Sequence, residues 1–170
     1  QGPSKNSKAS GVIVELLGDL MAPGMEIQIA LRNHDLPHKW SESVLGEASA
    51  IAEAFKAGQF KQRKDLRSLP FVTIDGADAR DFDDAVCAMH VNGEQVLYVA
   101  IADVSHYVRP GSALDSEALA RGTSVYFPSQ VIPMLPEELS NGICSLMPSV
   151  DRAVLVAELH ITADGSIGRS

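Results

Sequence analysis

The chain has 170 residues, of which 45% are hydrophobic and 21% are charged, and its formal net charge at pH 7 is −8. This hydrophobic content excludes an intrinsically disordered chain, and the length by itself favours one domain. The negative charge, relieved only by a short basic stretch from Lys61 to Lys64, excludes a protein that coats nucleic acid electrostatically. A polyanionic substrate would therefore need bound cations.

The cysteines and the apolar runs limit the cellular setting. Cys87 and Cys144 are far apart and form no C-x-x-C pair, which argues against a structural zinc site and a disulfide framework and favours a reducing cytoplasm. No apolar stretch approaches the ~20 residues that span a bilayer. The polar start of the chain has no hydrophobic signal region behind it. We expect a soluble cytoplasmic protein with no membrane partner.

Residues 1–40 predict part of a β-domain. Two β-rich runs, Val12 to Leu17 and Met25 to Leu31, flank the turn-forming pair Pro23-Gly24. Two or three strands bury too little apolar surface to be stable alone. We therefore expect an incomplete domain here.

Residues 41–68 predict a helical connector. Ser41 is a candidate N-cap, and Gly58 a candidate stop, for a helix whose apolar residues recur at helical spacing: Val44, Leu45, Ala48, Ile51, Ala52 and Phe55. The basic stretch Gln59 to Arg67 predicts a linker, with a domain boundary near residues 60–68.

Residues 69–170 alternate strand and helix patterns. Strands are predicted for Pro70 to Ile74, for AVCAMHV and QVLYVAIADV around the hairpin pair Asn92-Gly93, and for AVLVAELHIT. The Val96 to Val104 run is apolar on both faces, which predicts a central strand covered on both sides. A helix is predicted for ALDSEALARG, ending at Gly122, and an irregular proline-rich passage follows it. The pattern predicts an α+β fold with a mixed β-sheet and flanking helices.

The most informative segment is IDGADARDFDDAV, which lies between two apolar runs. Ile74, Phe82, Ala85 and Val86 are expected to anchor this backbone to a core, so that its carboxylates are held in place. In an extended stretch Asp81 and Asp83 project to the same side. Gly76 permits a turn that brings Asp75 back toward them. Asp75, Asp81, Asp83 and Asp84 are thus candidates for one cluster.

Clustered carboxylates repel one another and favour a hard cation. Oxygen-only ligands favour Mg²⁺, with Mn²⁺ as a substitute, over zinc. Two such ions ~3.5–4 Å apart can stabilise the attacking and leaving oxygens of phosphodiester hydrolysis. The segment does not fit the calcium loop D-x-[DN]-x-[DN]-G-x₅-E. An acidic surface turn without metal explains the composition equally well, so residue chemistry alone leaves both interpretations open.

The spacing D-x₅-D-x-D-D of these aspartates resembles the acidic signature of the ribonuclease II and ribonuclease R superfamily. Three further passages follow in the family's order, namely VAIADVSHYV, RGTSVYFPSQVIPMLPEELSNGICSL and DRAVLVAELHI. The resemblance implies that 69–170 is the N-terminal part of an RNB exoribonuclease catalytic domain. It also implies that 1–40 is the C-terminal remnant of an OB-type cold-shock barrel, a fold that binds single-stranded nucleic acid.

The resemblance also implies individual roles. Asp75 and Asp84 would be the main magnesium ligands, Asp81 would support the site, and Asp83 would be the acid whose loss harms chemistry most. Tyr126 would stack near the terminal nucleotides of single-stranded RNA, although a core aromatic between Val125 and Phe127 is a serious alternative.

The implied activity is 3′-to-5′ hydrolysis of RNA to nucleoside 5′-monophosphates. The later part of the family's catalytic domain is not in this sequence, so the isolated chain is expected to be weak or inactive and to self-associate through unpaired strand edges. The rival interpretation is a non-catalytic RNA-binding or regulatory module. Asp103 and Arg109 line an RNA channel or form local salt bridges, and the sequence does not separate these roles. The five scattered histidines show no metal-ligand spacing.

Overall fold

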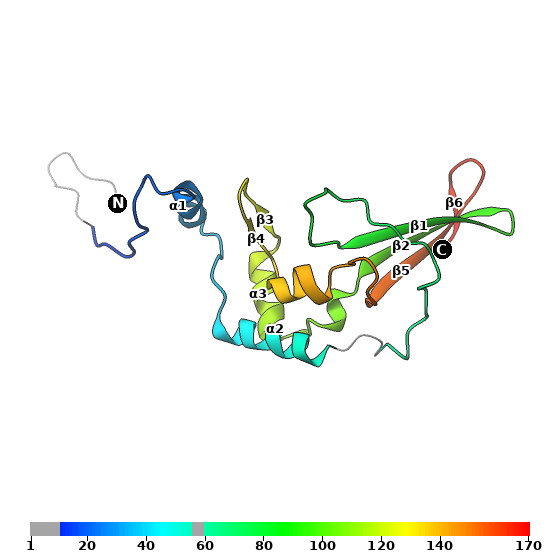
Figure 1. Ribbon diagram of the computed structural model, residues 1–170, viewed down its shortest axis with the longest axis horizontal. Helices are drawn as coiled ribbons and strands as arrows, with labels where there is room; N and C mark the ends of the chain where they lie inside the picture. Colours follow the sequence, from blue (N-terminus) through cyan, green and yellow to red (C-terminus); the bar gives the residue numbers. More distant parts are fainter. Residues whose placement is uncertain (1–10, 56–59) are drawn as a thin grey trace.

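The computed structural model describes residues 11–55 and 60–170, and Gly58 lies outside these ranges. A four-stranded sheet occupies one end of the elongated molecule, helices occupy the middle, and the N-terminal segment extends at the other end (Figure 1). The elements in chain order are α1 Met25–Asn33, α2 Glu42–Ala54, β1 Asp84–Val91, β2 Glu94–Ala102, the 3₁₀ turn η1 Val104–His106, α3 Ala113–Arg121, β3 Val125–Tyr126, β4 Val131–Ile132, the π-helical η2 Glu138–Ile143, β5 Val154–Ile161 and β6 Ile167–Arg169.

The sheet has the strand order β1-β2-β5-β6, and every pairing described in it is antiparallel. The predicted hairpin is confirmed, because β1 and β2 pair from Asp84 with Ile101 to Val91 with Glu94. Asn92 and Gly93 both have positive φ, 52° and 85°, which is the backbone that a two-residue type I′ turn requires. The α+β class is thereby confirmed.

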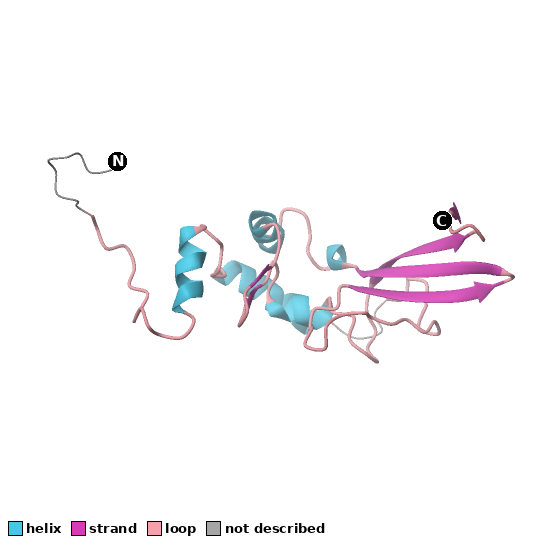
Figure 2. Ribbon diagram, turned by 90° about the horizontal axis from the view of Figure 1, so that it is seen from above, coloured by secondary structure: helices cyan, strands magenta, loops and turns pink. Residues whose placement is uncertain are grey.

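β2 is central, as predicted, but it is not covered on both sides. Val96 and Ala100 point to a buried face, whereas Ile101 on the opposite face is 47% exposed. Its register partner Leu155 on β5 is 60% exposed. The expectation of a doubly covered strand was therefore wrong, because nothing in residues 11–55 or 60–170 covers this end of the second face. Figure 2 shows the long strands projecting away from the helices.

The main core lies where α2, α3 and η2 meet. Ser41 caps α2 as predicted, since its side chain accepts a hydrogen bond from the Val44 backbone N–H. Ser112 caps α3 in the same way, and Gly122 ends that helix with φ 73°. Nine buried residues form this core: Val44, Ala48, Tyr107, Leu114, Ala118, Leu135, Leu139, Ile143 and Cys144.

The two N-terminal strands were predicted wrongly. Met25–Asn33 is a helix, which fits the strong helix formers in MEIQIALRN and the i, i+4 hydrogen bond from Arg32 to Gln28. The Val12 to Leu17 run has no regular secondary structure and pairs with no strand that the structure describes, and Val12 and Val14 are almost fully exposed. Apolar alternation predicts a strand only where a partner exists to pair with it.

The predicted strand from Pro70 to Ile74 is reduced to a single bridge between Val72 and Val86. The predicted strand AVLVAELHIT is confirmed as β5, and β6 pairs with the very end of it to form a C-terminal hairpin. None of the helices in the described ranges is long and apolar enough to cross a membrane.

Candidate active site

The four aspartates lie on the loop that leads into β1 and on the first residue of that strand. A turn closed by the Ala79 N–H to the Gly76 carbonyl reverses the chain after Asp75. The Val72–Val86 bridge holds the segment before the loop against β1. Asp84 then begins β1 opposite Ile101. The apolar flanks and Gly76 therefore act largely as the sequence predicted, with the exception of Ile74, which is 83% exposed and anchors nothing in this structure.

Backbone hydrogen bonds fix the loop from two sides. The Ala102 N–H, at the end of β2, donates to the Asp83 carbonyl at 2.9 Å. The Leu146 N–H, beyond η2, donates to the Phe82 carbonyl at 2.9 Å. These contacts join segments that are about 20 and about 60 residues away in sequence. The peptide backbone that carries Asp81 and Asp83 is thus anchored between the sheet and the helical core.

The carboxylates interact electrostatically. Partial burial raises the pKa of Asp83 most, and the negative charges of Asp81, Asp84 and Asp75 raise it further, in that order. Like charges raise the pKa of a carboxylate when they lie near it. Asp75, Asp81 and Asp84 therefore act electrostatically on Asp83 from the same loop and the first residue of β1.

The side chains are not arranged as a finished ligand set. Within the described ranges no group of three or more histidine, cysteine, aspartate or glutamate side chains is positioned to hold a metal ion. Asp75, Asp83 and Asp84 are exposed and so have room to turn. The donors are all carboxylate oxygens, which suits Mg²⁺ or Mn²⁺ and not the nitrogen and sulfur preference of zinc. The donor chemistry fits a hard divalent cation, and the carboxylate side chains would have to turn to coordinate it.

Tyr126 belongs to this site and not to the core. Its hydroxyl donates to Asp81 Oδ2 at 3.0 Å, and its side chain is 66% exposed. The hydrogen bond to Asp81 is the main cause that raises the pKa of Tyr126. The residue lies on β3, which pairs with β4 as a small separate hairpin. The interpretation of Tyr126 as a core aromatic was wrong.

Asp103 and Arg109 lie in different environments. Asp103 is 5% exposed and accepts hydrogen bonds from Arg63, Ser105 and the His106 backbone N–H, so it closes a local salt bridge. Arg109 is exposed, and its guanidinium reaches the Ser105 carbonyl at 3.5 Å. Asp103 therefore ties the linker at Arg63 to the end of β2 and has a structural role.

Comparisons with known proteins place the chain. A family model described as the RNB domain matches residues 63–170, which is more than half of the sequence. The chain belongs to the RNB domain family. A second family model, described as a cold shock domain, matches residues 1–41. The resemblance to the ribonuclease II and ribonuclease R superfamily is confirmed, and so is the cold-shock assignment of the N-terminal segment.

Relatives of this RNB chain are much longer proteins. Ribonuclease R of Escherichia coli is 55% identical over 168 residues, which cover 98% of this chain and 21% of that protein. Ribonuclease R of Vibrio cholerae is 54% identical over 165 residues, or 96% of this chain and 20% of that protein. The chain thus spans about a fifth of the length of these curated relatives.

Solved structures agree with the fold. The RNase R of Mycoplasma genitalium in complex with ribose methylated single-stranded RNA matches with a TM-score of 0.83 and 36% identity, over 90% of this chain and 24% of that one. Yeast Ssd1, described as a pseudonuclease, matches with a TM-score of 0.65 at 19% identity, over 90% of this chain and 20% of that one, which shows the RNB fold alone.

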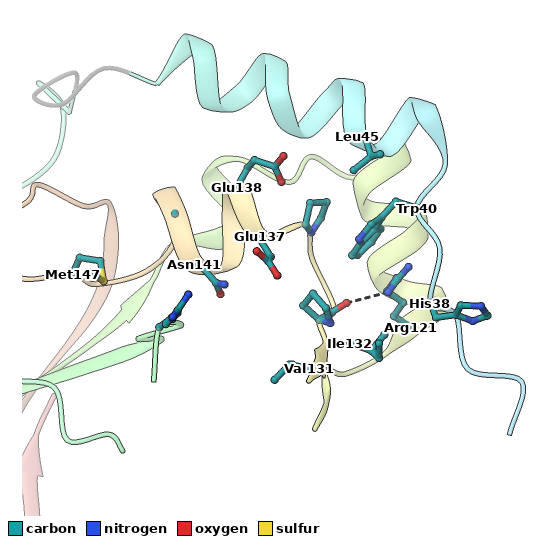
Figure 3. Close-up of a pocket in the computed structure, with 14 residues that line it drawn as sticks. His38, Trp40, Leu45, Arg121, Val131, Ile132, Glu137, Glu138, Asn141 and Met147 are labelled. Carbon is teal, nitrogen blue, oxygen red and sulfur yellow. Dashed lines mark hydrogen bonds between the residues drawn. The ribbon is translucent and has the colours of Figure 1, made fainter. Parts of the chain in front are cut away.

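A pocket of about 890 Å³ borders the acidic loop of the RNB fold. Arg80, which precedes Asp81, lines this pocket. Val131 and Ile132 of β4 also line it, and β4 pairs with β3, the strand that carries Tyr126. Figure 3 shows Trp40 stacked near Arg121 on one side and Glu137 and Glu138 on another. Arginines and glutamates together do not form the basic groove that single-stranded nucleic acid favours. The pocket is therefore not assigned to the phosphate path.

Two residues near the site were not singled out from the sequence. Ser145 is fully buried and contacts the aspartate loop, and Arg152 contacts the segment that carries Ser145. Arg152 is one of only two arginines after residue 121, which is the only signal in the sequence that marks it. Nothing in the sequence distinguishes Ser145 from the chain's other serines.

Proposed function

We propose that this chain is part of a 3′-to-5′ exoribonuclease that hydrolyses single-stranded RNA to nucleoside 5′-monophosphates. Membership of the RNB family and relatives named Ribonuclease R support this proposal. A related structure that contains single-stranded RNA supports the substrate class. The observation that carries it is the placement of all four aspartates on one loop and the first residue of β1, where backbone hydrogen bonds anchor that loop at Phe82 and Asp83.

The residues have distinct proposed roles. Asp75 and Asp84 would be the main ligands of Mg²⁺, or of Mn²⁺ in its place, and Asp81 and Asp83 would complete the set. When bound, such a cation would neutralise the carboxylates, accept a phosphate oxygen and lower the pKa of a water molecule. Asp83, whose ionisation is opposed by burial and by the charges of the other three, is the acid whose loss we expect to reduce hydrolysis most.

The chemistry is a single displacement. Water attacks the phosphorus of the last phosphodiester, the bond to the preceding 3′ oxygen breaks, and that oxygen takes up a proton. The products are a nucleoside 5′-monophosphate and an RNA shortened by one nucleotide with a free 3′ hydroxyl. Tyr126, exposed beside Asp81, has its ring available for stacking on a base near the 3′ end. The 2′ hydroxyl would distinguish RNA from DNA.

We infer that the chain alone hydrolyses RNA weakly or not at all. The absence of an arranged ligand set within residues 11–55 and 60–170 supports this, because the cation must first draw the exposed carboxylates together. The test is incubation of the chain with a labelled oligoribonucleotide and magnesium. Release of nucleoside 5′-monophosphates at rates typical of enzymes, about 1–1,000 per second, would contradict the inference.

The metal site has its own test. Titration of magnesium or manganese should raise the thermal unfolding midpoint of the wild-type chain, since a ligand that binds only the folded state stabilises it. An Asp83→Asn, Asp84→Asn double variant should show no such rise. Equal behaviour of the two proteins would show that the ion site is not assembled in this chain.

The rival proposal is a non-catalytic RNA-binding or regulatory module. The resemblance to a pseudonuclease shows that the RNB fold exists without the activity, although at 19% identity it shows nothing about this chain's chemistry. All four aspartates are present here, which favours the enzyme. RNA binding that is unchanged by removal of magnesium and by the double variant, with no hydrolysis, would favour the rival.

We also infer that the chain self-associates and that its parent acts in the cytoplasm. Two free buried cysteines fit a reducing compartment. The outer edge of β5 from Val154 to Leu159 pairs with no other strand in the described ranges, and Ile101 and Leu155 expose apolar surface beside it. Open edges next to apolar surface favour pairing between copies of a chain.

A further inference from the structure

We propose that Ser145 and Arg152 form a clamp that positions the aspartate loop for cation binding. The proposal rests on the proposed function, because it assigns these residues to the same metal site. Ser145 would act as a positioning residue through the backbone on either side of Asp81. Arg152 would act one step further away, through the segment that carries Ser145.

The Ser145 hydroxyl makes two hydrogen bonds that flank Asp81. Ser145 Oγ donates to the carbonyl of Arg80 at 2.7 Å, and it accepts from the backbone N–H of Phe82 at 3.1 Å. One hydroxyl thus engages the residue before Asp81 and the residue after it. These contacts set the path of the backbone through Asp81 and hence the direction of its carboxylate.

The Ser145 hydroxyl donates one of these hydrogen bonds, accepts the other, and is shielded from water. Ser145 is completely buried, so a backbone carbonyl or N–H that lost this partner would not regain one from bulk solvent without local opening. The next residue adds a third contact, because the Leu146 N–H donates to the Phe82 carbonyl. The segment Ser145–Leu146 therefore holds one side of the loop, and Ala102 holds the other side at Asp83.

Arg152 fixes the clamp itself. Its Nε donates to the Ser145 carbonyl at 2.8 Å, and its Nη2 donates to the Gly142 carbonyl at 3.1 Å. Its guanidinium also lies 5.5 Å from the ring centroid of Phe55, at the end of α2. A planar guanidinium that bridges two carbonyls holds their spacing, which a lysine cannot do. The chain of contacts runs from Arg152 to Ser145 and on to the backbone of Asp81.

The clamp would position a metal ligand through the backbone. The carboxylates of Asp75, Asp83 and Asp84 are exposed and have room to turn, so the backbone must supply much of the precision that a metal site needs. Partners in the shell outside the metal ligands commonly contribute about 10–100-fold to metal affinity. Ser145 occupies such a position with respect to Asp81.

The test uses the ¹⁵N-labelled chain with manganese alone as the probe. Ser145→Ala is compared with wild type and with Ser140→Ala, a matched control on η2 whose hydroxyl donates to the Pro136 carbonyl just before that helix. We expect Ser145→Ala to bind manganese at least about tenfold more weakly and to exchange the Phe82 amide proton faster. Ser140→Ala should match wild type in both measurements.

Several outcomes would overturn the proposal. Unchanged manganese affinity or unchanged Phe82 exchange in folded Ser145→Ala refutes the clamp while leaving the proposed function intact. If Ser145→Ala does not fold, Arg152→Lys decides, since it keeps the hydroxyl and the charge: weaker manganese binding by a folded protein supports the clamp, and wild-type affinity refutes it. Failure of the wild-type chain itself to bind manganese refutes the proposed metal site, and the clamp with it.

Discussion

Asp83→Asn should stabilise the metal-free chain while abolishing its response to magnesium. Asp83 is the member of the cluster whose ionisation is opposed by burial and by the charges of Asp81, Asp84 and Asp75. Asparagine has almost the same shape, so it removes the repulsion without leaving a cavity. Relief of unfavourable surface charge commonly adds about 0.5–2 kcal/mol to the free energy of unfolding, which for a chain of this size is a rise of about 1–8 °C in the unfolding midpoint.

The sign of the pH dependence follows from the raised pKa. The folded chain holds the Asp83 proton more tightly than the unfolded chain does, so the destabilisation is absent below the unfolded pKa of about 4. It grows as pH rises and is complete above the folded pKa. Asp83→Asn should therefore raise the midpoint at pH 7 and have little effect near pH 3.

Differential scanning fluorimetry with and without magnesium measures both effects. Asp78→Asn is the matched control, because Asp78 is an exposed acid of the same loop that does not appear among the charges acting on Asp83. We expect Asp78→Asn to keep the magnesium response. If Asp83→Asn lowers the metal-free midpoint at pH 7, or retains the magnesium response, the electrostatic account of the site is refuted.

Three further predictions concern other contacts. Tyr126→Phe removes the hydrogen bond to Asp81 but keeps the ring, so it should change manganese affinity by less than about tenfold and leave stacking on RNA intact. Tyr126→Ala removes the ring and should weaken RNA binding by about 1–3 kcal/mol in a fluorescence anisotropy titration. Burial raises the pKa of Asp103, but hydrogen bonds from Ser105 and Arg63 outweigh it and the net pKa is lowered. Asp103→Asn should therefore cost about 1–3 kcal/mol in urea unfolding at pH 7, and less as pH falls below about 4, where wild type loses the same stabilisation. Leu155→Lys should reduce self-association in sedimentation velocity, while the same change at Val12, which is exposed but lies in no strand, should not.

Local signals predicted the hairpin and the two core helices because each is specified by residues close in sequence. Asn92-Gly93 requires the positive φ values that the structure shows, and Ser41 and Ser112 cap the helices that follow them. The N-terminal error has the opposite cause. Met25, Ile27 and Leu31 fit a strand period as well as the i, i+4 spacing of a helix, so the apolar pattern alone does not separate the two, and only the helix formers between them favour the helix.

The membership of the site was predictable only in part. The aspartates lie within ten residues of one another, so their clustering follows from the loop, whereas Tyr126 meets Asp81 across 45 positions. Ser145 meets Phe82 across 63 positions. Contacts of that separation depend on how η2 packs beside the sheet, and no periodicity or composition in a single sequence encodes them. The resemblance supplied Tyr126, and the structure was needed for Ser145.

The contrast between an anchored backbone and the exposed carboxylates of Asp75, Asp83 and Asp84 bears on how an acidic chain with the proposed function would bind a cation. With a net charge of −8 and four clustered aspartates, the site repels phosphate until a cation is present. The anchors at Phe82 and Asp83 are hydrogen bonds between backbone groups that need no cation, so rotation of side chains would suffice to bring the exposed carboxylates to one. Rotation of a few exposed carboxylates costs far less than folding a loop, for which each ordered residue costs about 1–2 kcal/mol of backbone entropy. Cation affinity would then depend on the backbone anchors more than on contacts among the carboxylates. A substitution of the buried Ser145, which is not itself a ligand, should therefore lower that affinity.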